Sequence, residues 1–182
     1  MLKTSDILDE KDKRLRNKNE DVVFPMEKSE KKLINDMLEH LHLSQIDEEA
    51  QKYDLRPGMG LAAPQVGVNK NFFVICHEEE ENLFRNYVIV NPKLVSHSEE
   101  LVYASGGEGC LSVNREVEGI VPRYARVTFE GYDVDGNKIR YRAREELAIA
   151  FQHEMDHLNG ILFFDHIDPK DPYKNANFMR EI

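Results

Sequence analysis

The sequence predicts an α+β fold with mainly antiparallel strands, and three features of the 182-residue chain support this class. Strand-like runs follow one another between residues 58 and 143, and helical periodicity marks residues 26–53 and 145–158. Neither an internal repeat nor a low-complexity linker divides the chain. We therefore expect one domain over residues 1–182, with an N-terminal amphipathic helix and a second helix late in the chain.

The segment from Met26 to Tyr53 predicts an amphipathic helix that packs one stripe of side chains on the core. Its apolar residues recur at helical spacing: Leu33, Ile34, Met37, Leu38 and Leu41. Charged residues fill the opposite face, and Ser29 is the predicted N-cap.

Four segments have the short apolar or alternating pattern that is typical of strands: Phe72–Cys76, Tyr87–Val90, Val127–Glu130 and Lys138–Tyr141. We expect Cys76, at the end of the first run, to be a core residue. The like charges of Glu78–Glu81 predict a solvated loop after it. The last two segments flank Asp135-Gly136, which predicts a hairpin.

A helix is predicted from Glu145 to Leu158, because the apolar run in its first half is followed by the stop signal Asn159-Gly160. Ile161–Phe164 has the composition of a last short strand. The tail after Asp168 carries two prolines and few apolar residues, and no element is predicted there.

Composition and charge exclude several classes of protein. With 24 basic and 34 acidic residues the net charge is −10, which disfavours binding to DNA and to anionic membranes. Apolar runs fall short of the ~20 residues that span a bilayer. The first 18 residues lack the apolar core of a secretory signal, and two cysteines cannot form a disulfide framework. We expect a cytoplasmic protein.

The strongest chemical signal is the sequence His-Glu-Met-Asp-His at residues 153–157. Residues four apart lie on one face of a helix, so His153 and His157 can bind one metal ion. Glu154 can lie beside the open coordination position and take a proton from water there.

A catalytic metal site usually has three protein ligands, so a third must come from elsewhere in the chain. His166 is out of register with the longer histidine motifs of metallopeptidases. Cys110 is a candidate, since Gly107 and Gly109 give its backbone the freedom to approach an ion. Taken alone, it fits a buried free thiol better than a metal ligand.

Residues 58–67 form a third unusual segment, Gly-Met-Gly-Leu-Ala-Ala-Pro-Gln-Val-Gly. Its small residues allow another backbone to come close, and Gln65 offers an amide. The spacing matches neither a dinucleotide-binding fingerprint nor a P-loop, so by itself the segment indicates only a tight turn.

Taken together, residues 58–65, 108–112 and 152–157 resemble, in order, the three motifs of the peptide deformylases. The intervening segments resemble the form found in low-GC Gram-positive bacteria. The resemblance implies the deformylase fold, with sheets around the helix that carries the two histidines. It also implies a metal-dependent hydrolase that removes the formyl group from the N-terminal formylmethionine of nascent polypeptides and releases formate.

The resemblance implies roles for individual residues as well. The implied metal ligands are Cys110, His153 and His157. Glu154 corresponds to the general acid and base, and Gln65 and the backbone N–H of Leu111 correspond to the oxyanion donors. The resemblance implies Fe²⁺ as the metal, with Zn²⁺, Ni²⁺ or Co²⁺ as substitutes. The ligand set does not distinguish these, because one cysteine with two histidines suits zinc and iron alike.

In the family, the substrate backbone pairs as an extended strand with the glycine segment, and an apolar pocket holds the methionine side chain. The corresponding substrate-binding positions are Gly58, Met59, Gly60, Gly109, Ile149 and Ala150. Glu108 and Arg123 match a supporting ion pair next to the metal ligands. Glu146 departs from the apolar residue that many members carry at the pocket rim, and we expect it to point to solvent.

Two alternatives remain open at this point. A zincin-type metallopeptidase shares the histidine helix but takes its third ligand downstream, so Cys110→Ala would spare metal binding. A non-catalytic protein that senses oxygen or docks on the ribosome would have no use for Glu154. For a deformylase we expect only weak contact with the ribosome, because the chain is acidic.

Overall fold

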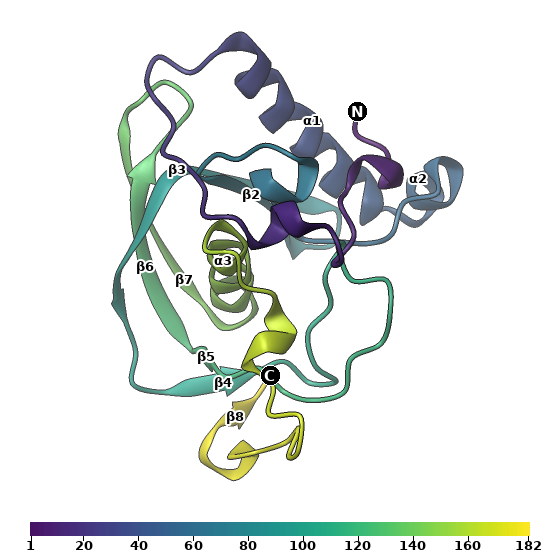
Figure 1. The fold of residues 1–182 in the computed structure, drawn as a ribbon, viewed down its shortest axis with the longest axis vertical. Helices are drawn as coiled ribbons and strands as arrows, with labels where there is room; N and C mark the ends of the chain where they lie inside the picture. Colours follow the sequence, from purple (N-terminus) through teal and green to yellow (C-terminus); the bar gives the residue numbers. More distant parts are fainter.

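A computed structural model describes all residues, 1–182, and its largest feature is a five-stranded antiparallel sheet (Figure 1). The strands lie in the order β1-β2-β3-β6-β7. Their bounds are Gly60–Ala62 for β1, Phe72–Glu80 for β2, Leu83–His97 for β3, Arg126–Tyr132 for β6 and Lys138–Arg144 for β7. Helix α3, Glu145–Leu158, packs on the inner face of this sheet. The arrangement confirms the predicted α+β class.

The contact between α3 and the sheet is an aromatic core. Phe151 of α3 is fully buried against Phe73 of β2 and Phe129 of β6. Burying an aromatic side chain of this size contributes about 2–3 kcal/mol to folding. Here the packed rings also set the distance between α3 and the sheet. The helix begins and ends at the predicted residues, with Asn159 as C-cap and Gly160 in the left-handed region at φ 71°.

A second, three-stranded sheet lies below α3 in the order β5-β4-β8 (Figure 1). Its strands are β4 (Leu101–Tyr103), β5 (Arg123–Tyr124) and β8 (Arg180–Glu181). β8 runs parallel to β4, so the tail in which no element was expected adds a strand.

The opposite face of the large sheet is covered by α1, Lys28–Ser44. Ile34, Met37 and Leu41 of its apolar stripe are buried against β1 and β2. The prediction of one helix up to Tyr53 was wrong, because α1 ends at Ser44 and a separate α2 covers Asp47–Tyr53. Ser44 Oγ and Gln45 Nε2 both donate to Leu41 O, at 2.8 and 3.1 Å, and so compete with continuation of the helix.

The predicted N-cap was also wrong. The N-cap of α1 is Glu27, whose backbone N–H donates to Glu30 Oε2 at 2.9 Å. Ser29 lies inside the first turn and donates its hydroxyl to Glu27 Oε2 at 3.2 Å. Glu30 thus acts as the N3 carboxylate of a capping box, which satisfies the backbone N–H of the N-cap residue.

Two further segments differ from expectation. Glu78–Glu80 continue β2, exposed and paired with β3, because ladder hydrogen bonds need no apolar side chains. The residues predicted as a last strand, Ile161–Phe164, instead lead into a 3₁₀ turn, and Asp165 Oδ2 accepts from Leu162 N at 3.0 Å to start it.

The remaining elements are short. The 3₁₀ helices are η1 (Thr4–Asp6), η2 (Lys13–Arg16), η3 (Ala63–Val66), η4 (Phe163–His166) and η5 (Ala176–Phe178). The predicted hairpin is confirmed, since β6 and β7 pair in antiparallel register around Gly136, which has φ 82°. Cys76 is confirmed as a core residue, fully buried, and burial raises the pKa of its thiol to about 11. None of the helices combines the length and apolar character that a membrane crossing requires.

Candidate active site

A cavity of about 830 Å³ brings together the three segments that the sequence singles out. It lies between β1, the loop that precedes Ser112, and the N-terminal part of α3. The site residues predicted from sequence that line it are Gly58, Met59, Gly60, Gln65, Glu108, Gly109, Cys110, Leu111, Ile149, Ala150, His153 and Glu154. The other two predicted site residues do not line the cavity. His157 lies one turn after His153 on α3, and Arg123 contacts the lining residue Glu108.

Cys110, His153 and His157 form a group of side chains that could hold a metal ion. Their ligand atoms all lie within 4.8 Å of one another, and Cys110 Sγ is 3.3 Å from His157 Nε2. Ligands of a tetrahedral zinc-type centre stand roughly 3.3–3.7 Å apart, given bond lengths of about 2.0–2.3 Å. One cysteine sulfur and two imidazoles beside the cavity therefore fit a three-ligand site with an open position.

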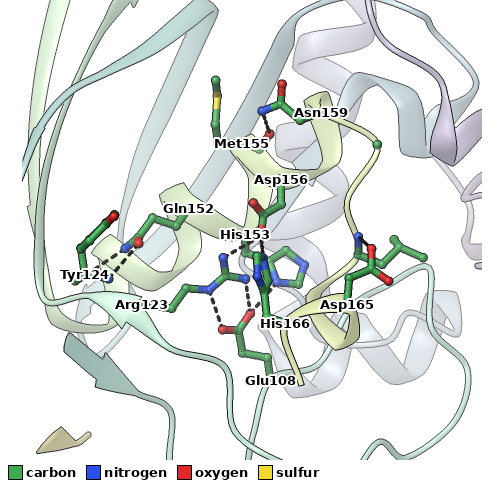
Figure 2. Close-up of polar contacts among 12 residues, drawn as sticks. Glu108, Arg123, Tyr124, Gln152, His153, Met155, Asp156, Asn159, Asp165 and His166 are labelled. Atoms are coloured by element: carbon green, nitrogen blue, oxygen red, sulfur yellow. Dashed lines mark hydrogen bonds and ion pairs between the residues drawn. The ribbon is translucent and has the colours of Figure 1, made fainter. Parts of the chain in front are cut away.

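His153 is oriented by a buried ion pair (Figure 2). Its Nδ1 lies 2.8 Å from Glu108 Oε1, which leaves Nε2 for the metal side. Arg123 donates to both Glu108 oxygens, at 2.8 and 2.9 Å, and both side chains are 4% exposed. Burial alone raises the pKa of Glu108, but bonds from His153 and Arg123 outweigh it and bring this pKa to about 2. Glu108 is therefore ionised.

The pair extends to α3 and to the following 3₁₀ turn. Arg123 Nη1 donates to Asp156 Oδ2 at 2.6 Å, and the same oxygen lies 2.8 Å from His166 Nε2 (Figure 2). His166 thus contacts a carboxylate and not the metal-capable group. Gln152 joins α3 to β5 through two 2.9 Å hydrogen bonds with the backbone of Tyr124, which sets the position of Arg123 beside it.

His157 is buried, and its Nδ1 has no hydrogen-bond partner. Burial, followed by the charge of His153, holds the pKa of His157 well below its usual value. A neutral imidazole is the form that binds a metal ion, so this environment suits a ligand.

Glu154 is 3% exposed, and desolvation raises its pKa to about 7. Neither of its oxygens accepts a hydrogen bond within the protein, and Oε2 is fully buried, so the acceptors of this carboxylate are left unused. The other oxygen, Oε1, lies against Gly60, where an added Cβ would come within 2.4 Å of it. The carboxylate can occupy this position because residue 60 has no side chain.

Gln65 is held by the 3₁₀ helix η3 and is fully buried. Ala62 N donates to its Oε1 at 2.9 Å, which fixes the amide so that Nε2 faces Ser112 Oγ at 3.1 Å and Cys110 Sγ at 3.6 Å. The backbone N–H of Leu111 donates to no group of the protein. Two N–H donors, one of them unused, therefore flank the cysteine.

β1 is an edge strand whose free side belongs to the cavity wall. Cys76 N donates to Met59 O at 2.8 Å, so Met59 and Cys76 form a hydrogen-bonded pair. Such pairs alternate along an antiparallel ladder, and the next residue, Gly60, therefore directs its N–H and C=O away from β2. These groups can pair with an added strand.

Met59, Ile149 and Ala150 provide apolar wall to the cavity. Glu146 lies at the rim with a 74% exposed side chain, 3.8 Å from His77 Nε2, so the expectation that it points to solvent agrees with its position. Two neighbours of the site have no role in the sequence analysis. Asp156 could have been suspected from its place between the histidines, whereas nothing local marks Arg56.

Comparisons with known proteins point to one family. A family model described as Polypeptide deformylase matches residues 4–173. A peptide deformylase of Listeria monocytogenes is 49% identical over 173 residues, which cover 94% of each chain. Peptide deformylase 2 of Bacillus cereus is 44% identical over 173 residues, which cover 95% of this chain and 94% of its own length.

The fold agrees as well. The crystal structure of peptide deformylase from Thermus thermophilus matches with a TM-score of 0.73 and 34% identity, covering 91% of this chain and 87% of that one. The family model spans nearly the whole chain, and these two relatives match 94–95% of it. The chain therefore belongs to the polypeptide deformylase family.

Proposed function

We propose that this chain hydrolyses the formyl group from the N-terminal formylmethionine of nascent polypeptides, with Glu154 as the residue that moves the proton. The reaction follows from family membership, and the relatives give no support to a zincin-type peptidase or a non-catalytic metal protein. The observation that carries the residue assignment is the buried Glu154 carboxylate, which has a free oxygen beside a metal-capable group.

Cys110, His153 and His157 are the proposed metal ligands. A divalent ion bound there supplies Lewis acidity, which lowers the pKa of a water molecule and polarises the formyl carbonyl. We assign Fe²⁺ as the metal in the cell, with Zn²⁺, Ni²⁺ or Co²⁺ as substitutes. The donor set suits zinc and iron equally, so the choice of iron rests on the family resemblance.

The Glu154 carboxylate takes the proton from the attacking water and later delivers it to the amine nitrogen. The oxygen of water bonds to the formyl carbon, the C–N bond breaks, and formate leaves. A carboxyl group with a pKa near 7 can accept and donate at neutral pH, which is the requirement for a single acid–base residue. Glu108 and Arg123 support the chemistry indirectly by orienting His153.

Gln65 Nε2 and the Leu111 N–H are the proposed donors to the formyl oxygen as it gains negative charge. Both come from rigid surroundings, since Gln65 is anchored on Ala62 and Leu111 follows the cysteine ligand. Loss of one such donor typically costs about 2.7–4 kcal/mol of transition-state stabilisation.

The substrate backbone is proposed to pair with Gly60 as an added strand, running past Gly58 and Gly109. Met59, Ile149 and Ala150 then contact the methionine side chain. Backbone pairing makes binding insensitive to the residues after methionine. Crowding around the metal by Gly60, Gln65 and Leu111 is proposed to reject an acyl group larger than formyl.

We also propose that contact with the ribosome is weak and depends on salt, because a net charge of −10 opposes binding to RNA phosphates. Sedimentation of the protein with purified ribosomes at several salt concentrations tests this. A tight complex that is unaffected by salt would contradict it.

The experiment for the function is release of formate from formyl-Met-Ala-Ser by protein purified without oxygen and loaded in parallel with Fe²⁺, Ni²⁺ or Zn²⁺. We expect fast release with iron or nickel and loss of release in Glu154→Gln, which keeps the shape of the side chain. Absence of release with every metal, at one bound ion per chain, would refute the proposal.

A further inference from the structure

We propose that Arg56 is a positioning residue, which aims the Leu111 N–H into the cavity and strengthens it as a hydrogen-bond donor. The inference rests on the proposed role of that N–H in the reaction. Arg56 lines the cavity just before β1, far in sequence from the loop that it contacts. Arg56 is not part of the metal-capable group.

The guanidinium of Arg56 bonds only to the loop that carries the cysteine. Its Nη2 donates to Cys110 O at 2.9 Å and to Leu111 O at 2.5 Å. Its Nη1 donates to Val113 O at 3.2 Å and to Asn114 Oδ1 at 2.9 Å. None of the four bonds ends on a carboxylate, so no side-chain charge neutralises this cation.

The planarity of the peptide bond turns this contact into an orientation of the Leu111 N–H. The Cys110 carbonyl and the Leu111 N–H belong to one trans peptide group, so they point in opposite directions. Arg56 holds the carbonyl on one side, and the N–H is thereby directed to the other. Val113 N also donates to Cys110 O, at 3.0 Å, from within the loop.

The neighbouring peptide groups are held in the same way. Glu10 N donates to Ser112 O at 2.7 Å, so the consecutive carbonyls of residues 110 to 113 all have donors. Ser112 N lies 3.4 Å from Cys110 Sγ, whereas the Leu111 N–H has no acceptor. Among residues 111 to 113, only the N–H of Leu111 is therefore unused, and Arg56 donates three of the hydrogen bonds that hold the carbonyls of this segment.

A cation behind the peptide group also changes its chemistry. Charge-assisted hydrogen bonds are about twice as strong as neutral ones. A hydrogen bond to the carbonyl polarises the peptide and makes its N–H a better donor on the far side. The effect grows as the acceptor gains negative charge, so it favours the transition state over the bound substrate.

The test compares Arg56→Gln, Arg56→Lys and Arg56→Ala with a matched control, Arg115→Gln. Arg115 lies in the same loop region, but its guanidinium donates hydrogen bonds only to Glu10, at 2.7 and 3.0 Å, and lies over the ring of Phe164. We expect kcat of Arg56→Gln to fall by about 100-fold, the lower end of the effect of losing an oxyanion donor, with KM nearly unchanged. Arg56→Lys keeps the charge, so its kcat should lie between those of the parent and Arg56→Gln. The kcat of Arg115→Gln should stay within about 3-fold of the parent.

Three readouts separate positioning from a merely structural role. Metal content per chain should be unchanged in Arg56→Gln. The amide proton of Leu111 should shift in the NMR spectrum, because its peptide loses polarisation. Millimolar guanidinium ion should restore part of the kcat of Arg56→Ala, and urea at equal concentration should not.

Full kcat in Arg56→Gln would overturn the inference while leaving the proposed function intact. Loss of activity that is fully restored by saturating metal would also overturn it, since Arg56 would then only support the ligand Cys110. If Arg56→Ala does not fold, the test rests on the kcat and the Leu111 amide shift of Arg56→Lys. A parent-like kcat and an unchanged amide shift in that variant would overturn the inference. Failure of the proposed function is a different result, namely an inactive parent or an active Glu154→Gln.

Discussion

Replacing Gly60 with alanine tests whether the fold places the Glu154 carboxylate where the chemistry needs it. A methyl group at position 60 would lie 2.4 Å from Glu154 Oε1 and 2.8 Å from Cδ, whereas ordinary contacts begin at 3.4 Å. The carboxylate must therefore move by about 1 Å, and a misplacement of that size costs on the order of 10²-fold in rate.

The substitution should affect stability much less than activity. Gly60 is not in the left-handed region, so alanine can adopt its backbone conformation. The clash falls on the end of a side chain, and overpacking of this kind costs about 1–3 kcal/mol. Thermal unfolding and metal content of Gly60→Ala are the controls for this point.

The assay is kcat/KM on formyl-Met-Ala-Ser, measured for Gly60→Ala, Glu154→Gln and the double variant. If the methyl group acts only by displacing the carboxylate, it should change the residual rate of Glu154→Gln by less than about 3-fold. The reasoning is refuted if Gly60→Ala retains activity within about 3-fold of the parent, or if its effect is the same in both backgrounds.

Three further changes test other parts of the site. Gln65→Ala should lower kcat by about 10²–10³-fold with unchanged metal content, because one oxyanion donor is lost; a changed KM alone would argue against that role. Arg123→Met leaves Glu108 buried without its partner and should lower the free energy of unfolding in urea by about 3–5 kcal/mol; a loss below about 1 kcal/mol would contradict the buried pair. Cys110→Ala should abolish stoichiometric metal binding, as measured by elemental analysis, whereas retained binding would require another third ligand. The Cys76 thiol, with its pKa of about 11, should not react at pH 8, so metal-free parent protein should titrate one thiol, that of Cys110, and a count of two would contradict its burial.

Elements with a strong local signal were predictable from the sequence. The bounds of α3 follow from an apolar run that ends at Asn159-Gly160, and the β6–β7 hairpin follows from Gly136 between alternating segments. Elements defined by distant partners were not. β8 is two residues long and exists because it pairs with β4, about 80 residues earlier in the chain.

The same distinction applies to the site. The two histidines and Glu154 share one helix, so their spacing alone predicts a common face. For Cys110 the local sequence left two interpretations, a metal ligand or a buried free thiol. Only the family resemblance grouped it with the two histidines. Arg56 shows the limit of local patterns, because its function depends on carbonyls more than 50 residues away, and any sequence around position 110 would offer them.

The open edge of β1 carries a consequence for when the enzyme can act. An exposed strand edge can pair with other chains and cause aggregation, so proteins usually cover or shorten it. The edge of β1 is three residues long and lies in the cavity wall. A polypeptide that pairs with Gly60 has to offer its first residues extended and unpaired. A space of about 830 Å³ admits a few residues and no folded domain. Chain ends already packed into tertiary structure are out of reach, so folding of the client competes with its processing.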